Sequence, residues 1–223
     1  MEVTRKIREL KAELPADVCL VAVSKTKPDE LIMDAYEGGH RDFGENKVQD
    51  LAAKAERLPG DIRWHMIGHL QTNKVKYIAP FVHMIHGVDS LKLLKAINKE
   101  ALKNQRIIDV LLQAKIATEE SKFGLAGDEI LDMLASEEFR ALENVRLRGL
   151  MGMATYTENS DQIRAEFQSL KRIFDEIRSS SEYGQREHFN QRSFGMSGDY
   201  KLAVEEGSTM VRIGSLIFGV RSR

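Results

Sequence analysis

The stretch that decides the fold is Val18-Cys-Leu-Val-Ala-Val-Ser-Lys-Thr-Lys-Pro28. Its first six residues form a continuous apolar run, which is typical of a strand covered on both faces in a parallel sheet. Pro28 suits the first position of a helix, and the two acidic residues after it suit the first turn. We therefore predict a strand, a turn that contains Lys25, and a helix that ends near Gly38.

The same unit of a strand followed by a helix recurs along the chain. Seven further strand candidates are bounded by glycine, proline or polar residues, at 41–43, 62–67, 84–88, 109–116, 147–153, 188–194 and 210–214. Helices are expected between them, at 46–57, around 74–78, and at 91–104, 128–135, 161–178 and 199–206. Eight alternating units predict an α/β fold, a (β/α)8 TIM-type barrel, with an extra helix near residues 2–13. The alternative, a doubly wound open sheet, expects a glycine-rich first turn, and residues 24–28 contain no glycine.

Composition narrows the class of protein. The chain has 223 residues, 42% hydrophobic and 30% charged, with a net charge of −1 and one cysteine. We expect a single domain over 1–223, because that length suffices for one full core. The balanced charge argues against nucleic acid, and no apolar run is long enough for a membrane span. The lone cysteine and the absence of a visible signal peptide predict a cytoplasmic protein.

Lys25 stands directly after the first predicted strand, where the active groups of β/α barrels lie. Apolar surroundings disfavour a charged amine, and a neutral amine is what Schiff-base formation with an aldehyde needs. The competing interpretation is a solvated lysine in an ordinary loop, and the local sequence alone favours it.

Two segments that follow the last strands predict a phosphate site. In 193–199, the glycines let backbone N–H groups approach an anion, and Ser197 can donate its hydroxyl. In 212–215, Arg212 precedes Gly214 and Ser215. Barrels commonly bind phosphate with the loops after strands seven and eight. Ser197 could instead cap a helix, and Arg212 could form a surface ion pair.

Polar residues elsewhere leave two further questions. Asn46, in the run Phe43-Gly-Glu-Asn46, could bind a ligand or cap the next helix. The histidine pairs His65/His69 and His83/His86 raise the question of a metal. Neither pair is accompanied by an acidic cluster in the sequence, so we expect no metal site.

Several motifs together resemble one known family, the YggS/PROSC pyridoxal phosphate homeostasis proteins. The matching segments run in family order over about residues 18–221 and comprise 21–28, Phe43–Asn46, Trp64-His65, 67–74, Lys122–Gly124, 149–153, Gly195–Ser197, and 207–219. The resemblance implies a barrel similar to the N-terminal domain of bacterial alanine racemase, of fold type III, without the racemase's C-terminal β domain.

The resemblance also assigns roles to residues of this chain. It implies pyridoxal phosphate held as a Schiff base on Lys25, with Arg212 facing the pyridine nitrogen. Asn46 would lie close to the cofactor and Met151 would line the pocket. The phosphate would lie on Ser197, Gly198, Gly214 and Ser215. The chain departs from the family pattern in having serine at 215, where many relatives have threonine, and a more polar segment at 190–194.

The final sequence question is whether the chain is an enzyme or a carrier. An arginine at the ring nitrogen keeps that nitrogen unprotonated and weakens the ring as an electron sink. Racemisation, the alternative function, needs an acid/base on each face of the substrate. Tyr156 is the best placed of the tyrosines but is no obvious second base. We therefore expect a monomeric cofactor carrier, with apo forms of pyridoxal phosphate enzymes as recipients, and no classical turnover.

Overall fold

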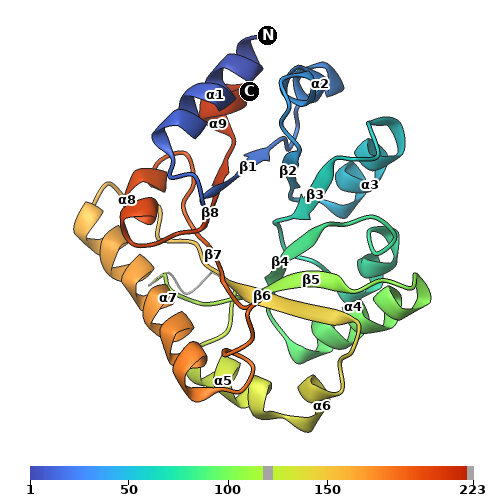
Figure 1. Ribbon diagram of the computed structural model, residues 1–223, viewed down its shortest axis with the longest axis vertical. Helices are drawn as coiled ribbons and strands as arrows, with labels where there is room; N and C mark the ends of the chain where they lie inside the picture. Colours follow the sequence, from blue (N-terminus) through green and yellow to red (C-terminus); the bar gives the residue numbers. More distant parts are fainter. Residues whose placement is uncertain (118–122, 220–223) are drawn as a thin grey trace.

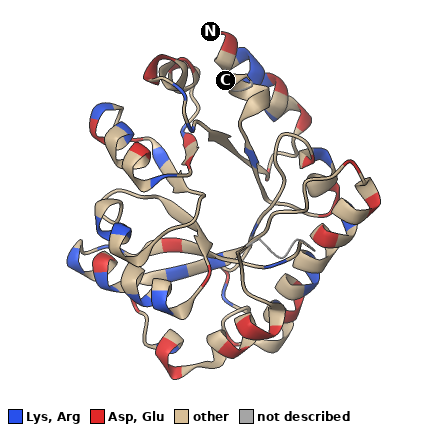
Figure 2. Cartoon of the chain, turned by 180° about the vertical axis from the view of Figure 1, so that it is seen from behind, with Lys and Arg blue, Asp and Glu red and all other residues tan. Residues whose placement is uncertain are grey.

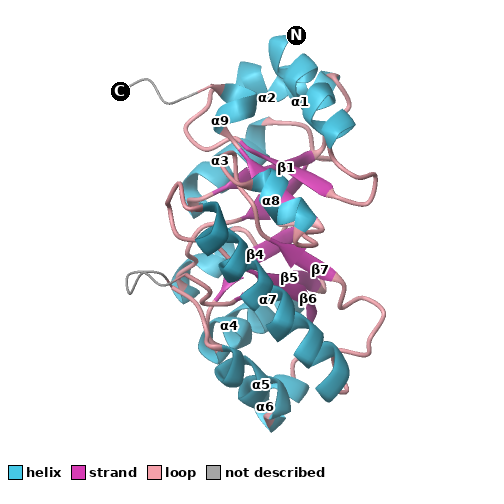
Figure 3. Cartoon of the chain, turned by 90° about the vertical axis from the view of Figure 1, so that its left-hand side faces the viewer, coloured by secondary structure: helices cyan, strands magenta, loops and turns pink. Residues whose placement is uncertain are grey.

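Eight parallel strands close into a barrel, in the order β1-β2-β3-β4-β5-β6-β7-β8 (Figure 1). The computed structural model describes residues 1–117 and 123–219. Seen from the side, the strands occupy the middle of the molecule and helices lie around them (Figure 3). The predicted (β/α)8 barrel is therefore confirmed.

All eight predicted strands are present, with ends that differ by a few residues. Their bounds are β1 Cys19–Val23, β2 Asp42–Glu45, β3 Arg63–Met66, β4 Met84–Val88, β5 Ile108–Gln113, β6 Val145–Met151, β7 Gln191–Ser193 and β8 Met210–Ile213. The strand predicted at 188–194 is shorter in the structure: β7 pairs with β6 over its three residues and with β8 only through Ser193 and Met210.

The predicted helices are also present, and two short ones were not predicted. Their bounds are α1 Glu2–Glu13, α2 Asp29–Glu37, α3 Val48–Arg57, α4 Leu91–Lys103, α5 Gly127–Ala135, α6 Glu137–Arg140, α7 Ser160–Ser180, α8 Tyr200–Glu205 and α9 Ser215–Phe218. The segment after β3 is a 3-10 helix, η1 Thr72–Tyr77. The two additional helices, α6 and α9, span four residues each, too few to show a hydrophobic period.

The barrel has two apolar layers. Strand residues that face outward, such as Leu20 and Ala22, pack with the helices in one large core. Inward-facing residues make a second, smaller core inside the barrel, formed by Val21, Met84, Leu111, Met151 and Met210. Because side chains alternate along a strand, one apolar run can supply both layers.

The first and last helices lie side by side. α1 packs against α2 and α9, so the two ends of the described chain meet beside β1 (Figure 1). Asp34 of α2 holds the start of α1, because its carboxylate accepts hydrogen bonds from the Val3 N–H at 3.1 Å and the Thr4 hydroxyl at 2.7 Å. The extra N-terminal helix is thus built into the barrel wall.

The outer surface mixes both charges. Figure 2 shows lysine and arginine interspersed with aspartate and glutamate along the helices. No helix in the described part of the chain is long and apolar enough to cross a membrane.

Candidate functional site

Lys25 lies in the tight turn that follows β1 and is half-buried. The next residue, Thr26, has φ 64°, a left-handed conformation that non-glycine residues seldom adopt. On the other side of Lys25, Ser24 is fully buried, and its N–H donates to the Gly44 carbonyl on β2. The backbone on both sides of Lys25 is therefore fixed.

A buried ion pair lies under that turn. Glu45 of β2 and Lys54 of α3 are 0% and 6% exposed, and their charged atoms are 2.7 Å apart. The Ser24 hydroxyl donates to the same Glu45 oxygen at 2.7 Å, and Lys54 Nζ donates to the Ser24 carbonyl at 2.9 Å. Neither Glu45 nor Lys54 was predicted to have a role, although Glu45 lies inside the Phe43–Asn46 run.

The loops after β7 and β8 meet where the sequence predicted. The Ser197 hydroxyl accepts a hydrogen bond from the Gly214 N–H at 3.3 Å. A side chain at position 214 would lie 3.2 Å from the Val23 carbonyl, so the glycine allows this loop to approach the end of β1. Ser197 does not cap α8, whose N-cap residue is Asp199. The end of β1 and both loops therefore come together.

The two remaining phosphate candidates border the same junction. Ser215 is exposed and opens α9, and Gly198 is exposed with open space around it. Lys27, from the turn after β1, donates through Nζ to the Phe218 and Gly219 carbonyls, each at 3.0 Å. It thereby caps the end of α9 and ties that helix to the turn that carries Lys25. This role of Lys27 was not predicted.

Arg212 points into the barrel and is 4% exposed. Its guanidinium donates to the Ser193 carbonyl at 2.7 Å, to the Ser193 hydroxyl at 2.6 Å and to the Gly152 carbonyl at 3.0 Å. Burial lowers the pKa of Arg212 to about 10, so the group stays charged at neutral pH. The surface ion pair considered from the sequence is wrong. Within the described chain, three bonds leave two of its five N–H groups available to a ligand.

Asn46 and Met151 lie at the carboxyl ends of β2 and β6. Asn46 is half-buried and does not cap α3, whose N-cap residue is Lys47. Met151 is 1% exposed and belongs to the core inside the barrel. It is in register with Ser193 of β7, the partner of Arg212.

Tyr156 lies apart from this group, and one further residue from the sequence analysis is not described by the structure. Tyr156, considered as a second base, is 98% exposed on the loop after β6. Lys122, the first residue of the Lys122–Gly124 match, lies outside the described residues.

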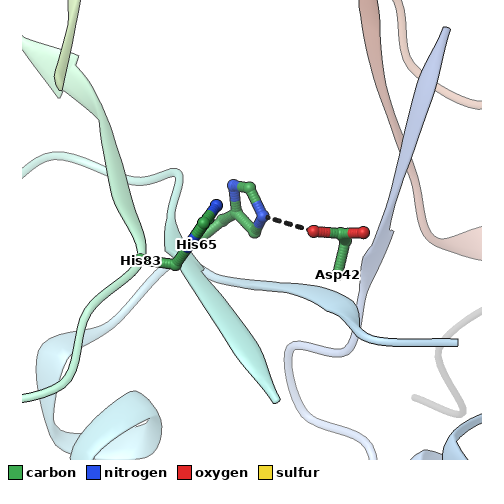
Figure 4. A group of neighbouring side chains, drawn as sticks. All are labelled: Asp42, His65 and His83. Carbon is green, nitrogen blue, oxygen red and sulfur yellow. Dashed lines mark hydrogen bonds and ion pairs between the residues drawn. The ribbon is translucent and has the colours of Figure 1, made fainter. Parts of the chain in front are cut away.

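One histidine of each pair does have an acidic neighbour in space, Asp42, which the sequence pattern did not indicate. Ligating atoms of Asp42, His65 and His83 lie within 4.8 Å of one another (Figure 4); Asp42 begins β2, His65 is the third residue of β3 and His83 directly precedes β4. The pattern of single strands cannot show this, because Asp42 reaches the histidines only through strand pairing. Burial tends to raise the pKa of Asp42, but hydrogen bonds from Arg63 and His65 outweigh it and lower the pKa.

A surface hollow lies away from these groups. It has a volume of about 800 Å³ and lies among α5, α6 and the end of α7, with Leu131, Phe139 and Tyr183 in its wall. Its lining contains no lysine, histidine or cysteine, so it does not share the chemistry of the Lys25 region.

These features define a class of β/α barrel with a lysine at the end of its first strand. In this chain the lysine is Lys25, and Arg212 and two glycine-containing loops accompany it. The family profile described as "Alanine racemase, N-terminal domain" matches residues 2–222. A pyridoxal phosphate homeostasis protein of Aquifex aeolicus is 40% identical over 206 residues, 91% of this chain and 86% of that protein. One from Vibrio alginolyticus is 37% identical over 212 residues, covering 93% and 88%. The chain therefore belongs to the alanine racemase N-terminal domain family and, within it, to the pyridoxal phosphate homeostasis proteins.

Solved structures agree with that membership. PipY of Synechococcus elongatus, solved without and with pyridoxal phosphate, has TM-scores of 0.90 and 0.88 at 32% identity, over 97% of this chain and 100% of PipY. Alanine racemase from Bartonella henselae has a TM-score of 0.72 at 15% identity, and the match spans 98% of this chain but 58% of the racemase. At that identity the racemase is similar in fold alone.

Proposed function

We propose that this chain binds pyridoxal phosphate, held as a Schiff base on Lys25, and serves in the homeostasis of that cofactor. The observation that carries the proposal is the hydrogen bond between Ser197 and Gly214, because it joins the two phosphate loops next to the end of β1. Pyridoxal phosphate supplies an aldehyde that can link to an amine, a ring nitrogen and a phosphate. The described residues offer one matching group for each.

The residues divide by their chemistry. Lys25 provides the amine, and Arg212 provides an N–H donor for the ring nitrogen, since two of its N–H groups have no partner among the described residues. The phosphate candidates are Ser197, Gly198, Gly214 and Ser215, and the first turn of a helix supplies N–H groups without partners inside the helix. Asn46 and Met151 would flank the ring from β2 and β6. PipY, which has been solved with pyridoxal phosphate bound and is 32% identical, supports the binding of this cofactor.

The arrangement favours a carrier over a racemase-like enzyme. Arg212 remains protonated at neutral pH, so it donates to the ring nitrogen and does not supply a proton that would make the ring a strong electron sink. A racemase needs a second acid/base opposite the lysine. Tyr156, the sequence candidate, is directed to solvent. We infer that the bound cofactor is stored and released, with apo enzymes as recipients, by a monomer in the cytoplasm.

The visible absorbance of the purified protein with added pyridoxal phosphate tests the binding. We expect a Schiff-base band, and a borohydride-trapped product on the peptide that contains Lys25. Lys25→Ala should lose the band and the trapped product. Lys99→Ala, an exposed lysine on α4, is the matched control and should keep both.

A wild-type protein that stays colourless with the cofactor would contradict the proposal. A band that persists in Lys25→Ala would assign the wrong lysine. For the carrier role, racemase, decarboxylase and transaminase activities should be assayed over a panel of amino acids. Turnover on the order of 1 s⁻¹ or faster would favour an enzyme.

A further inference from the structure

A line of polar side chains crosses the apolar interior of the barrel. It begins at Asp42 on β2 and passes through His65 on β3 and His86 on β4. It ends at Ser193 on β7 and Arg212 on β8. The histidines and Ser193 are 0–1% exposed, whereas Asp42 is 14% exposed at the amino end of its strand.

Every neighbouring pair in the line is within hydrogen-bonding distance. The Asp42 carboxylate is 3.2 Å from His65 Nε2, and His65 Nδ1 is 2.9 Å from His86 Nε2. His86 Nδ1 is 3.1 Å from Ser193 Oγ, which accepts from Arg212 at 2.6 Å. The line thus joins the amino-terminal mouth of the barrel to the arginine of the cofactor site.

With both imidazoles neutral, the carboxylate end fixes the direction of the bonds, because Asp42 can only accept. At the other end Arg212 can only donate, so Ser193 Oγ accepts from it and has its own proton to donate to His86 Nδ1. A neutral His86 then carries its proton on Nε2 and donates to His65 Nδ1. His65 in turn carries its proton on Nε2 and donates to the carboxylate, which can only accept. All four bonds are satisfied with both imidazoles neutral.

The reverse direction is costly. His65 would have to donate to His86 while still donating to Asp42, which requires a doubly protonated, charged ring in a side chain that is 1% exposed. The Asp42 carboxylate would compensate such a charge only in part, because both its oxygens already accept from the Arg63 guanidinium. The Ser193 proton would also lose its acceptor. A fully satisfied polar network inside an apolar core holds one geometry.

We propose that Asp42, His65, His86 and Ser193 form one directional hydrogen-bond chain that positions Arg212, with both histidines held as the Nε2–H tautomer. Asp42 acts as a remote counter-charge, because aligned hydrogen bonds polarise one another toward the carboxylate. The four are positioning residues. The tautomers are a property of the protein itself, and the effect on the cofactor rests on the proposed function.

A bound metal ion is the competing interpretation of the three side chains in Figure 4. Asp42, His65 and His83 have a suitable set of donor atoms. Both oxygens of Asp42, however, are held by the Arg63 guanidinium, with Nε at 2.7 Å from one of them. A cation would lie beside that positive group and would replace the bond from His65. The contacts therefore favour the hydrogen-bond chain.

Nitrogen-15 NMR tests the tautomers directly. Long-range proton–nitrogen spectra of the full-length protein at pH 7.5, before addition of cofactor, should show His65 and His86 protonated on Nε2. In Asp42→Asn the His86 pattern should change, because the asparagine amide can donate and reverse the chain. His86 does not contact Asp42, so a merely structural role for Asp42 would leave that pattern unaltered. An Nδ1–H tautomer of His86 in the wild type, or a charged His65, would overturn the proposal.

Cofactor binding gives a second readout. His86→Phe should weaken pyridoxal phosphate binding on the order of tenfold and shift the pH dependence of the absorbance band. Ser193→Ala, which also breaks the chain, should act in the same direction if the phenylalanine variant does not fold. His83→Phe is the matched control, because His83 contacts the His65 ring edge-on at 5.2 Å but is outside the chain. It should match the wild type.

The outcomes separate the two proposals. A wild type with the expected tautomers that binds no cofactor would contradict the proposed function and leave the chain supported. Normal binding and an unshifted pH dependence in both His86→Phe and Ser193→Ala would contradict the chain. Stoichiometric Zn²⁺ that perturbs the His65 signals, and fails to do so in His83→Phe, would also overturn it in favour of a metal site.

Discussion

At the residue scale, the ion pair between Glu45 and Lys54 supports the turn that carries Lys25. Exposed ion pairs contribute about 0–1 kcal/mol, but removing one partner of a buried pair leaves an uncompensated charge. In this protein, removal of the Lys54 ammonium would leave the charge of Glu45 uncompensated, and Glu45 is 0% exposed. The pair is therefore a point where a single substitution has a large effect.

Lys54→Met should lower the free energy of unfolding by about 3–5 kcal/mol, since it leaves Glu45 buried and unpaired. Urea denaturation at pH 7 measures the change. Lys103→Met, which removes an exposed pair with Glu100, is the matched control and should change stability by less than about 1 kcal/mol. Equal losses in the two variants would contradict the importance of burial.

Lys27 is a second residue whose role comes from the tertiary structure. Lys27→Met should weaken pyridoxal phosphate binding on the order of tenfold, because hydrogen bonds from a charged donor contribute about 1.5–3 kcal/mol and here they order α9. Titration followed by absorbance gives the affinity. Borohydride should still trap the cofactor on Lys25. Lys99→Met is the control and should bind the cofactor like the wild type. Unchanged affinity in Lys27→Met would show that α9 does not need the cap.

At the element scale, the position of β7 depends on close approach to β6. Gly149 has φ 152°, and a Cβ there would lie 1.8 Å from the Gln191 carbonyl. β7 has three residues and carries Ser193, so its position matters to Arg212.

Gly149→Ala should therefore lower the free energy of unfolding by at least the 1–3 kcal/mol or so that is typical of overpacking, because the clash is with backbone. Gly60→Ala offers a control, since nothing lies within 4 Å of its Cβ position. The control should stay within about 0.5 kcal/mol of wild type in the same urea experiment. A tolerated Gly149→Ala would mean that β7 can move away from β6 without loss.

At the scale of the whole molecule, buried histidines make stability depend on pH. Burial lowers the pKa of His40 to about 4 and that of His83 to about 4, and places the pKa of His86 well below 6.5. Lys11, Asp42 and Arg63 are the charged groups that act on His40. The unfolded chain binds more protons than the folded chain between these values and about 6.5.

The free energy of unfolding therefore falls as the pH falls. The contribution of these histidines to stability is complete above about pH 6.5 and is lost as the pH falls toward 4, by up to about 1.4 kcal/mol per pH unit for each group. Urea denaturation at several pH values between 4.5 and 7.5 measures the slope. His40→Gln should reduce the slope, and substitution of the exposed His69 should not. A flat profile in the wild type would show that the histidines are hydrated.

The eight strands, their alternation with helices and the position of Lys25 were determined by the sequence, because apolar runs and turn residues are local signals. The loops at 193–199 and 212–215 were found in the same way. The tertiary structure alone decided four other features. These are the hydrogen bond between Ser197 and Gly214, the cap that Lys27 forms on α9, the ion pair beneath Ser24, and the hydrogen-bond chain from Asp42 to Arg212. Each joins different elements, from nine residues apart for Glu45 and Lys54 to 192 apart for Lys27 and Gly219, and only the packing of strands, loops and helices in the closed barrel brings these atoms within hydrogen-bonding distance.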